Sequence, residues 1–194
     1  MRYRMAASAL AAFLILSVSA RGWADDFTNQ LDEAKAAYGK HDLRATQNAL
    51  NTAGTLLRQQ RLAQWQAVLP DALAGWKAET IEGGSAAMTM FGGGTSVSRR
   101  YHHGNASVTI EIISDSPIIA TVAAFMNGIL TMAGTELVMI DGHKTNYRKN
   151  ENSYTTLVAD KAMITVKGSG GVADEDLRAY VKAIHFAQIE KLVK

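Results

Sequence analysis

The stretch SVTIEIISDSPIIATVAAFMNGILTMAG, residues 107–134, decides how this chain folds. Its first seven residues alternate in character and place Val108, Ile110 and Ile112 on one face, which is the pattern of a half-buried strand. From Ser116 onward the stretch contains no charged residue. The sequence therefore predicts a strand that leads directly into an apolar helix.

The predicted helix spans residues 117–133 and begins with Ser116 as its cap and Pro117 at its first position, where a missing N–H costs nothing. Its large side chains recur at helical spacing, and we expect this face to pack on a sheet. That face consists of Ile118, Val122, Phe125 and Ile129. The segregation of large from small residues argues against a helix that faces lipid.

The N-terminus is typical of a secretory signal peptide. A basic start is followed by the apolar run Ala6–Val18 and by small residues, and we expect cleavage after Ala24, with Ala20 as the alternative. The apolar run is shorter than the roughly 20 residues that a spanning helix needs. The sequence thus predicts an exported, periplasmic protein without a membrane span in its mature chain; an uncleaved membrane anchor is the alternative.

The charge balance argues against a nucleic-acid partner. The chain has 20 Lys and Arg residues against 18 Asp and Glu, and loss of Arg2, Arg4 and Arg21 with the leader leaves 17 basic residues. A near-neutral protein lacks the basic field that nucleic acids require. The chain also has no cysteine, which excludes disulfides, thiolate metal sites and a cysteine nucleophile.

Residues 25–68 are predicted to form a helical hairpin. Apolar residues recur at helical spacing on both sides of a break at residues 39–42, and the second helix ends before Pro70. The pattern resembles half of a tetratricopeptide repeat, but such repeats need about three copies to bury a continuous core. We expect an ordinary antiparallel helix pair docked on the next domain.

Residues 69–194 are predicted to form an α+β sandwich domain. Strands are expected at residues 76–81, 95–101, 107–113, 137–140, 143–148, 153–159 and 162–166, and a final helix near Ala173. The connections between consecutive strands are too short for parallel crossovers. We therefore expect a mostly antiparallel sheet of about six to seven strands with helices packed on it.

A family resemblance rests on the order of these elements. It consists of the Leu69-Pro70 and Gly75-Trp76 pairs, the strand 107–113 with its uncharged helix, the turn after Ile140, and the closing hairpin and helix. This order resembles the PsbP and DcrB type of small exported α/β/α sandwich over residues 69–192. The resemblance implies that fold and a non-enzymatic accessory role, and it carries no functional residue across.

The expected contact surface for a ligand or a protein partner lies next to two glycine runs. Residues 83–84 and 92–94 bracket an apolar segment that is expected to be a mobile flap or a strand. On the neighbouring strand, alternation places Arg100 with His102, and arginine binds carboxylate or phosphate in a bidentate manner. A solvated sheet face is the alternative. The predicted contact residues are Met88, Met90, Phe91, Arg100 and His102.

A copper or zinc site is the second hypothesis. His102 and His103 lie in an expected turn, His143 lies at another turn, and the thioethers of Met88 and Met90 suit Cu(I). Adjacent histidines on a strand would instead point to opposite faces, so the site depends on the turn. Solvated turn histidines are the alternative reading.

Catalytic and nucleotide motifs are missing from the sequence. Neither glycine run gives a phosphate-binding motif, no serine lies in a nucleophile motif, and the acidic residues 174–176 suit the start of a helix. The sequence therefore predicts a non-enzymatic binding or accessory module without a cofactor, either monomer or homodimer. An uncharacterised hydrolase-like enzyme is a further alternative, because catalytic triads assemble from distant residues.

Overall fold

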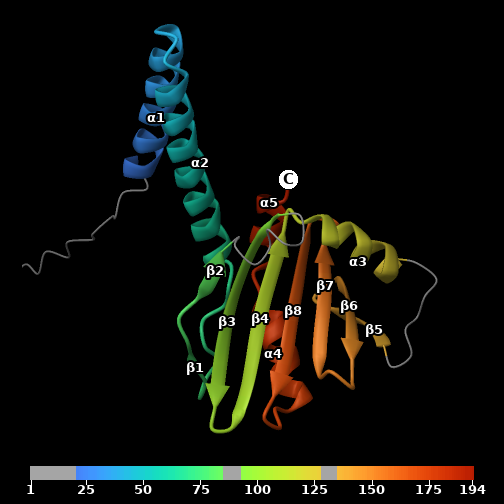
Figure 1. Ribbon diagram of the computed structural model, residues 1–194. Helices are drawn as coiled ribbons and strands as arrows, with labels where there is room; N and C mark the ends of the chain where they lie inside the picture. The colour runs from blue at the N-terminus through green and yellow to red at the C-terminus, as the bar shows by residue number, and fades with distance from the viewer. Residues whose placement is uncertain (1–20, 85–92, 128–134) are drawn as a thin grey trace, which may run out of the picture. The chain divides into compact units, whose positions relative to one another are not determined.

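The computed structural model describes residues 21–84, 93–127 and 135–194 of the chain (Figure 1). The chain divides into two compact units, Met1–Leu57 and Arg58–Lys194. The division lies inside the second helix. The last turns of this helix, after Leu57, belong to the second unit, because Trp65 is part of the hydrophobic core of that unit.

The first unit is a helical hairpin, as predicted. Helix α1 (Arg21–Gly39) and helix α2 (Leu43–Gln66) run antiparallel (Figure 1). The side chain of Asp42 starts α2, since its Oδ1 accepts a hydrogen bond from the Ala45 amide at 2.9 Å, which satisfies a free helix N–H. Small residues are buried along the helices: Ala34, Ala37, Ala49 and Ala53.

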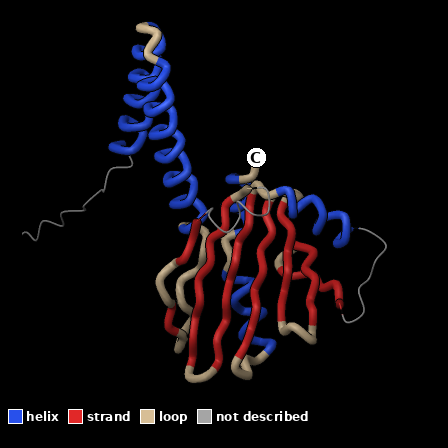
Figure 2. The backbone as a smooth tube through the Cα atoms, in the orientation of Figure 1, coloured by secondary structure: helices blue, strands red, loops and turns tan. Residues whose placement is uncertain are grey.

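The second unit contains an eight-stranded sheet whose main order is β1-β3-β4-β8-β7-β6-β5, with β2 paired to β3 (Figure 2). Every pairing is antiparallel, which confirms the α+β prediction. The strands are β1 (Lys77–Ala78), β2 (Glu82–Gly84), β3 (Thr95–His103), β4 (Ala106–Ser114), β5 (Thr135–Ile140), β6 (His143–Arg148), β7 (Ser153–Val158) and β8 (Ala162–Ser169).

The core of this unit lies between the sheet and two C-terminal helices, α4 (Asp174–Ala183) and α5 (Phe186–Leu192) (Figure 1). Strand β4 points Val108, Ile110 and Ile112 into this core, each at most 1% exposed. The predicted stripe of the final helix is buried against it: Leu177, Tyr180, Val181 and Ile184.

Helix α3 (Pro117–Asn127) buries a different side from the predicted one. Ile119 and Ala123 are buried, whereas Ile118 and Val122 are only half-buried. Ser116 does not cap the helix with its side chain: its buried hydroxyl has no hydrogen-bond partner, and its carbonyl oxygen accepts from the Ile119 amide at 3.0 Å. The first turn of α3 is therefore closed by this backbone hydrogen bond and not by the Ser116 side chain. The predicted burial of Phe125 and Ile129 on the sheet concerns side chains that lie outside the described part of the structure.

Three further boundaries differ from the predicted ones. The expected strand 76–81 is shortened to β1, and a separate short strand, β2, follows it; both pair with β3. Strand β3 continues through His103, so the turn is only Gly104-Asn105. The final helix is split into α4 and α5 because Ile184 has an extended backbone.

None of the helices in the described ranges is long and apolar enough to cross a membrane.

The burial of α3 predicts unequal effects of two neighbouring substitutions. Ile119→Ala should lower the free energy of unfolding by about 2–5 kcal/mol, the range for truncation of a buried isoleucine. Ile118→Ala should cost clearly less, since Ile118 is only half-buried. Urea unfolding of both variants measures the difference, and a larger loss for Ile118→Ala would contradict the observed orientation of the helix.

Candidate functional site

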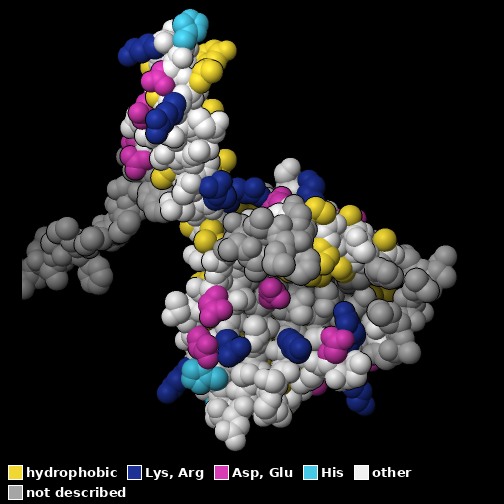
Figure 3. Space-filling view, in the orientation of Figure 1, with side chains coloured by type: hydrophobic (Ala, Val, Ile, Leu, Met, Phe, Trp, Pro, Cys, Tyr) yellow, Lys and Arg dark blue, Asp and Glu magenta, His cyan; other side chains and the backbone are white. Residues whose placement is uncertain are grey.

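The two faces of the sheet differ in chemistry. The face toward α4 and α5 is apolar, and the opposite face, seen in Figure 3, carries mainly hydroxyl and charged side chains. We call this second surface the polar face. Its polar residues are Glu79 after β1; Glu82 on β2; Ser96, Ser98, Arg100 and His102 on β3; Ser107, Thr109 and Glu111 on β4; Thr165, Lys167 and Ser169 on β8; Ser153 and Thr155 on β7; and Asn146 and Arg148 on β6. The same face carries apolar residues toward one end of the strands: Ile113, Met163, Leu157, Leu137 and Met139.

Three basic residues lie in one row across the polar face. The strand register places Arg100 opposite Thr109, Thr109 opposite Lys167, Lys167 opposite Ser153, and Ser153 opposite Arg148. Neighbouring strands are about 4.8 Å apart, so successive cations in the row are separated by roughly 10 Å along the sheet. Lys and Arg side chains, with Asp and Glu side chains among them, are visible across this face in the space-filling view (Figure 3). We call the row of Arg100, Lys167 and Arg148 the cation row.

The cations of this row differ in how they are neutralised. Arg148 forms an ion pair with Glu151 at 2.6 Å. Arg100 and Lys167 are exposed, and among the described residues no carboxylate pairs with either. Glu79 follows β1 opposite Arg100, where its amide donates to the Arg100 carbonyl oxygen at 2.8 Å, but its carboxylate lies 3.8 Å from His102 Nδ1. Glu111, opposite Ser98, accepts a hydrogen bond from the Ser96 hydroxyl at 3.2 Å. The row therefore presents positive charge to solvent.

A second row of polar groups lies at the end of β3. His102 is opposite Ser107, whose hydroxyl is 2.7 Å from that of Ser169. His102 Nδ1 is buried without a hydrogen bond and lies 3.8 Å from Glu79 Oε1. A base and its orienting carboxylate are normally about 2.6–3.2 Å apart. The row thus brings together carboxylate, imidazole and hydroxyl groups, but the carboxylate and imidazole are not hydrogen-bonded.

The structure does not bring the three candidate metal ligands together. His103 lies on the opposite face from His102 and contacts Trp76, with ring centroids 5.7 Å apart. His143 begins β6 at the other end of the sheet and stacks on Phe186 at 4.2 Å. Within residues 21–84, 93–127 and 135–194, no group of three or more His, Asp or Glu side chains is arranged to hold a metal ion.

Only two of the five predicted contact residues lie in the described part of the structure. Arg100 and His102 share the polar face, as their alternation predicted. Met88, Met90 and Phe91 lie outside the described residues. Lys167 and Arg148 share the row with Arg100, and no local pattern in the sequence predicts this, because the register of distant strands brings them together.

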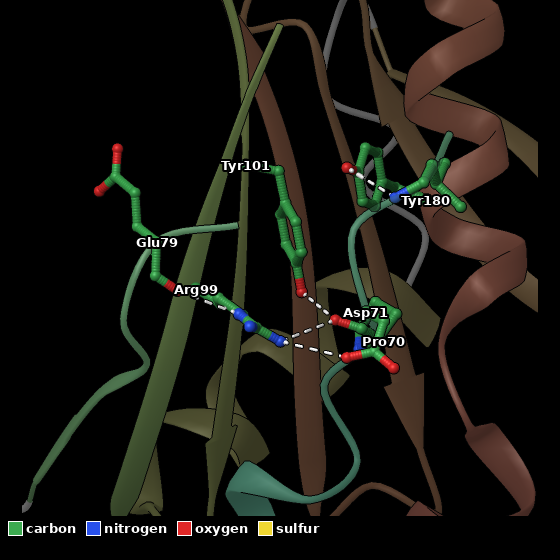
Figure 4. A network of polar contacts seen from close by, with 7 residues as sticks. Pro70, Asp71, Glu79, Arg99, Tyr101 and Tyr180 are labelled. Atoms are coloured by element: carbon green, nitrogen blue, oxygen red, sulfur yellow. Dashed lines mark hydrogen bonds and ion pairs between the residues drawn. The ribbon is translucent and has the colours of Figure 1, made fainter. Parts of the chain in front are cut away.

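A polar network behind the sheet fixes the segment that leads from α2 into β1 (Figure 4). Arg99 Nη1 and the Tyr101 hydroxyl both donate to the Pro70 carbonyl oxygen, at 3.2 and 2.7 Å. Arg99 Nε donates to the Glu79 carbonyl oxygen at 3.1 Å. The Tyr180 hydroxyl accepts from the Leu73 amide at 3.4 Å. The two tyrosine rings are 4.6 Å apart, so the network joins the segment to β3 and α4.

Tyr101 and Tyr154 stay protonated and act as hydrogen-bond donors. Burial raises the pKa of Tyr101 to about 12. Burial and a hydrogen bond to Asp174 raise the pKa of Tyr154 well above its ordinary value. Asp174 also accepts a hydrogen bond from Arg178 at 2.7 Å, and the guanidinium lies over the Tyr154 ring. These contacts anchor the start of α4 to the sheet, so we assign them a structural role.

Comparison of the chain with protein-family models, with curated proteins and with solved structures found no match.

The raised pKa of Tyr101 predicts a loss of stability in alkali. The phenol loses its proton near pH 10 in the unfolded chain but near pH 12 in the native state, so its contribution is complete below pH 10 and is lost as the pH rises to about 12. Tyr101→Phe should flatten this decline and lower stability at neutral pH by about 1 kcal/mol through the lost hydrogen bond. Urea unfolding at several pH values measures both effects.

Tyr38→Phe is the matched control, because Tyr38 is 65% exposed. Tyr38→Phe should change neither the free energy of unfolding at neutral pH nor its decline between pH 10 and pH 12. An alkaline decline that is unchanged by Tyr101→Phe would contradict the assigned role of Tyr101.

Proposed function

We propose that this chain is an exported, non-enzymatic accessory module whose polar face binds an acidic segment of a partner protein. The observation that carries the proposal is the cation row, in which Arg100 and Lys167 are exposed and free of ion pairs among the described residues. Export to the periplasm follows from the leader expected in residues 1–24. The resemblance to the PsbP and DcrB type of sandwich supports an accessory role.

The geometry of the row suits an extended acidic polypeptide. A chain in the polyproline II conformation has three residues per turn and rises by about 3.1 Å per residue, so carboxylates three residues apart lie on one face and match cations that are roughly 10 Å apart. Arg100 can bind a carboxylate with two parallel hydrogen bonds, and Lys167 provides a point charge beside it, whereas Arg148 is paired with Glu151. Thr109 lies between Arg100 and Lys167 in the same row and is half-buried, so its hydroxyl can bond to the peptide backbone, whereas Ser153 is only 3% exposed.

The electrostatics of the polar face favour fast, salt-sensitive binding. Exposed charges interact over a distance of about 8 Å at physiological ionic strength, so a row of cations attracts a polyanion before contact. The strand positions between Arg100 and Arg148 in the cation row carry Thr109, Lys167 and Ser153 and no apolar residue, which favours a polar partner segment over an apolar one. Binding should therefore weaken as salt rises.

A synthetic peptide with glutamate at every third position tests this proposal. Its affinity for the full chain is measured by isothermal titration calorimetry at low and at physiological salt. We expect saturable binding that Arg100→Glu and Lys167→Glu each weaken by at least about tenfold, or 1.4 kcal/mol. Lys182→Glu, an equal change of charge at an exposed position of α4, should leave the affinity unchanged.

Three results would contradict the proposal. The first is no saturable binding of the acidic peptide at low salt. The second is an equal loss of affinity in Lys182→Glu, which would show a general charge effect. The third is binding of an acidic polysaccharide but not of the peptide, which would exclude a polypeptide partner.

A further inference from the structure

The helical hairpin exposes large apolar side chains at a regular spacing. Leu43, Leu50 and Leu57 on α2 are separated by seven residues, and Leu31 and Tyr38 on α1 have the same separation. All are between 41% and 67% exposed. Apolar residues that recur every seven positions on helices form the seams along which helices pack in bundles. We call these five residues the leucine face.

The leucine face lies on one side of the hairpin. On a helical wheel with 100° per residue, the leucine-face residues of each helix lie roughly 80° away from the buried alanines of that helix. The direction of this rotation is the same in both helices. Because the helices run antiparallel, equal rotation in both brings the two stripes to the same side. Hydrophobic side chains gather along one side of the hairpin in the space-filling view (Figure 3).

The contact between the two helices leaves the leucine face without a partner inside the hairpin. The buried residues of Asp25–Leu57 are all alanines, whose side chains remove little apolar surface from water. Most of the stability of a helix in a protein comes from packing of its apolar face. The hairpin therefore has its larger apolar surface available for another helix pair.

We propose that the leucine face binds the leucine face of a second copy of this chain, which produces a two-fold symmetric four-helix bundle. A symmetric dimer needs a surface that is complementary to itself. With the two-fold axis at Leu50 and the two α2 helices antiparallel, Leu50 meets its own copy and Leu43 meets Leu57 of the partner subunit. This register overlaps the whole of residues 43–57.

Charge favours this antiparallel arrangement over a parallel one. Between residues 25 and 57, Asp25, Asp26, Asp32 and Glu33 lie toward the start of α1, whereas three basic residues, Lys35, Lys40 and Arg44, and one acid, Asp42, lie toward the turn. An antiparallel dimer places the acidic end of one hairpin against the basic end of the other. A parallel dimer would bring like charges together, which is destabilising.

Sedimentation equilibrium of the full chain tests the proposal, which does not depend on the function proposed for the polar face. We expect a species of twice the chain mass that Leu50→Glu converts to monomer at the same concentration. Asn48→Glu adds the same charge at an exposed position of α2 away from the leucine face and should leave the dimer intact. Circular dichroism checks that Leu50→Glu keeps its helix content.

Cysteine substitution gives a second test that is independent of the folding of Leu50→Glu. The chain has no cysteine of its own. Oxidised Leu50→Cys should form a covalent dimer, because position 50 faces its own copy, whereas Leu43→Cys should not, because it faces position 57. The double variant Leu43→Cys with Leu57→Cys should again crosslink.

Several outcomes would overturn the proposal. These are a monomer at every concentration that can be measured, a dimer that survives Leu50→Glu with its helix content intact, and crosslinking of Leu43→Cys alone in preference to Leu50→Cys. Crosslinking of Leu43→Cys alone would indicate a parallel dimer. A chain that stays monomeric would indicate that the leucine face does not bind a second copy.

Discussion

The rest of the second unit depends on the antiparallel pairing of β4 with strands on both of its sides. Strand β3 pairs with one edge of β4 and β8 with the other, so the backbone of β4 is hydrogen-bonded along its whole length. Its alternation then fixes both faces of the sheet, since a shift by one residue would expose Ile110 and Ile112 and bury Glu111. The position of α4 and α5 follows, because they cover the apolar face.

This arrangement explains how a small unit can hold both a core and a charged surface. The core receives one face of each strand, so the other face is free to carry hydroxyl groups and cations. The row of Arg100, Lys167 and Arg148 crosses β3, β8 and β6 and is held by the same ladders that bury the core. The network around Pro70 adds rigidity behind β3, since Arg99 and Tyr101 alternate with Arg100 along that strand.

Local patterns predicted the strands and the order of the elements better than they predicted the site. The alternation around Ile110 and the pairing of Arg100 with His102 needed only neighbouring residues, and both are present in the structure. Lys167 could not be assigned to the site, because its position beside Arg100 depends on the register between β4 and β8. His103 was placed in a turn because Gly104 and Asn105 are strong turn residues, but pairing with β4 extends the strand past it. The orientation of α3 also depends on tertiary packing.

Native-state hydrogen exchange tests the central position of β4 most directly. Amides of Ala106–Ser114 have partners on both sides, whereas β5 lies at the end of the described strand order. We predict that the β4 amides exchange only through global unfolding, with the free energy measured by denaturation, and that the β5 amides exchange faster through local opening. Exchange of the β4 amides at the rate of the β5 amides would contradict this account of the fold.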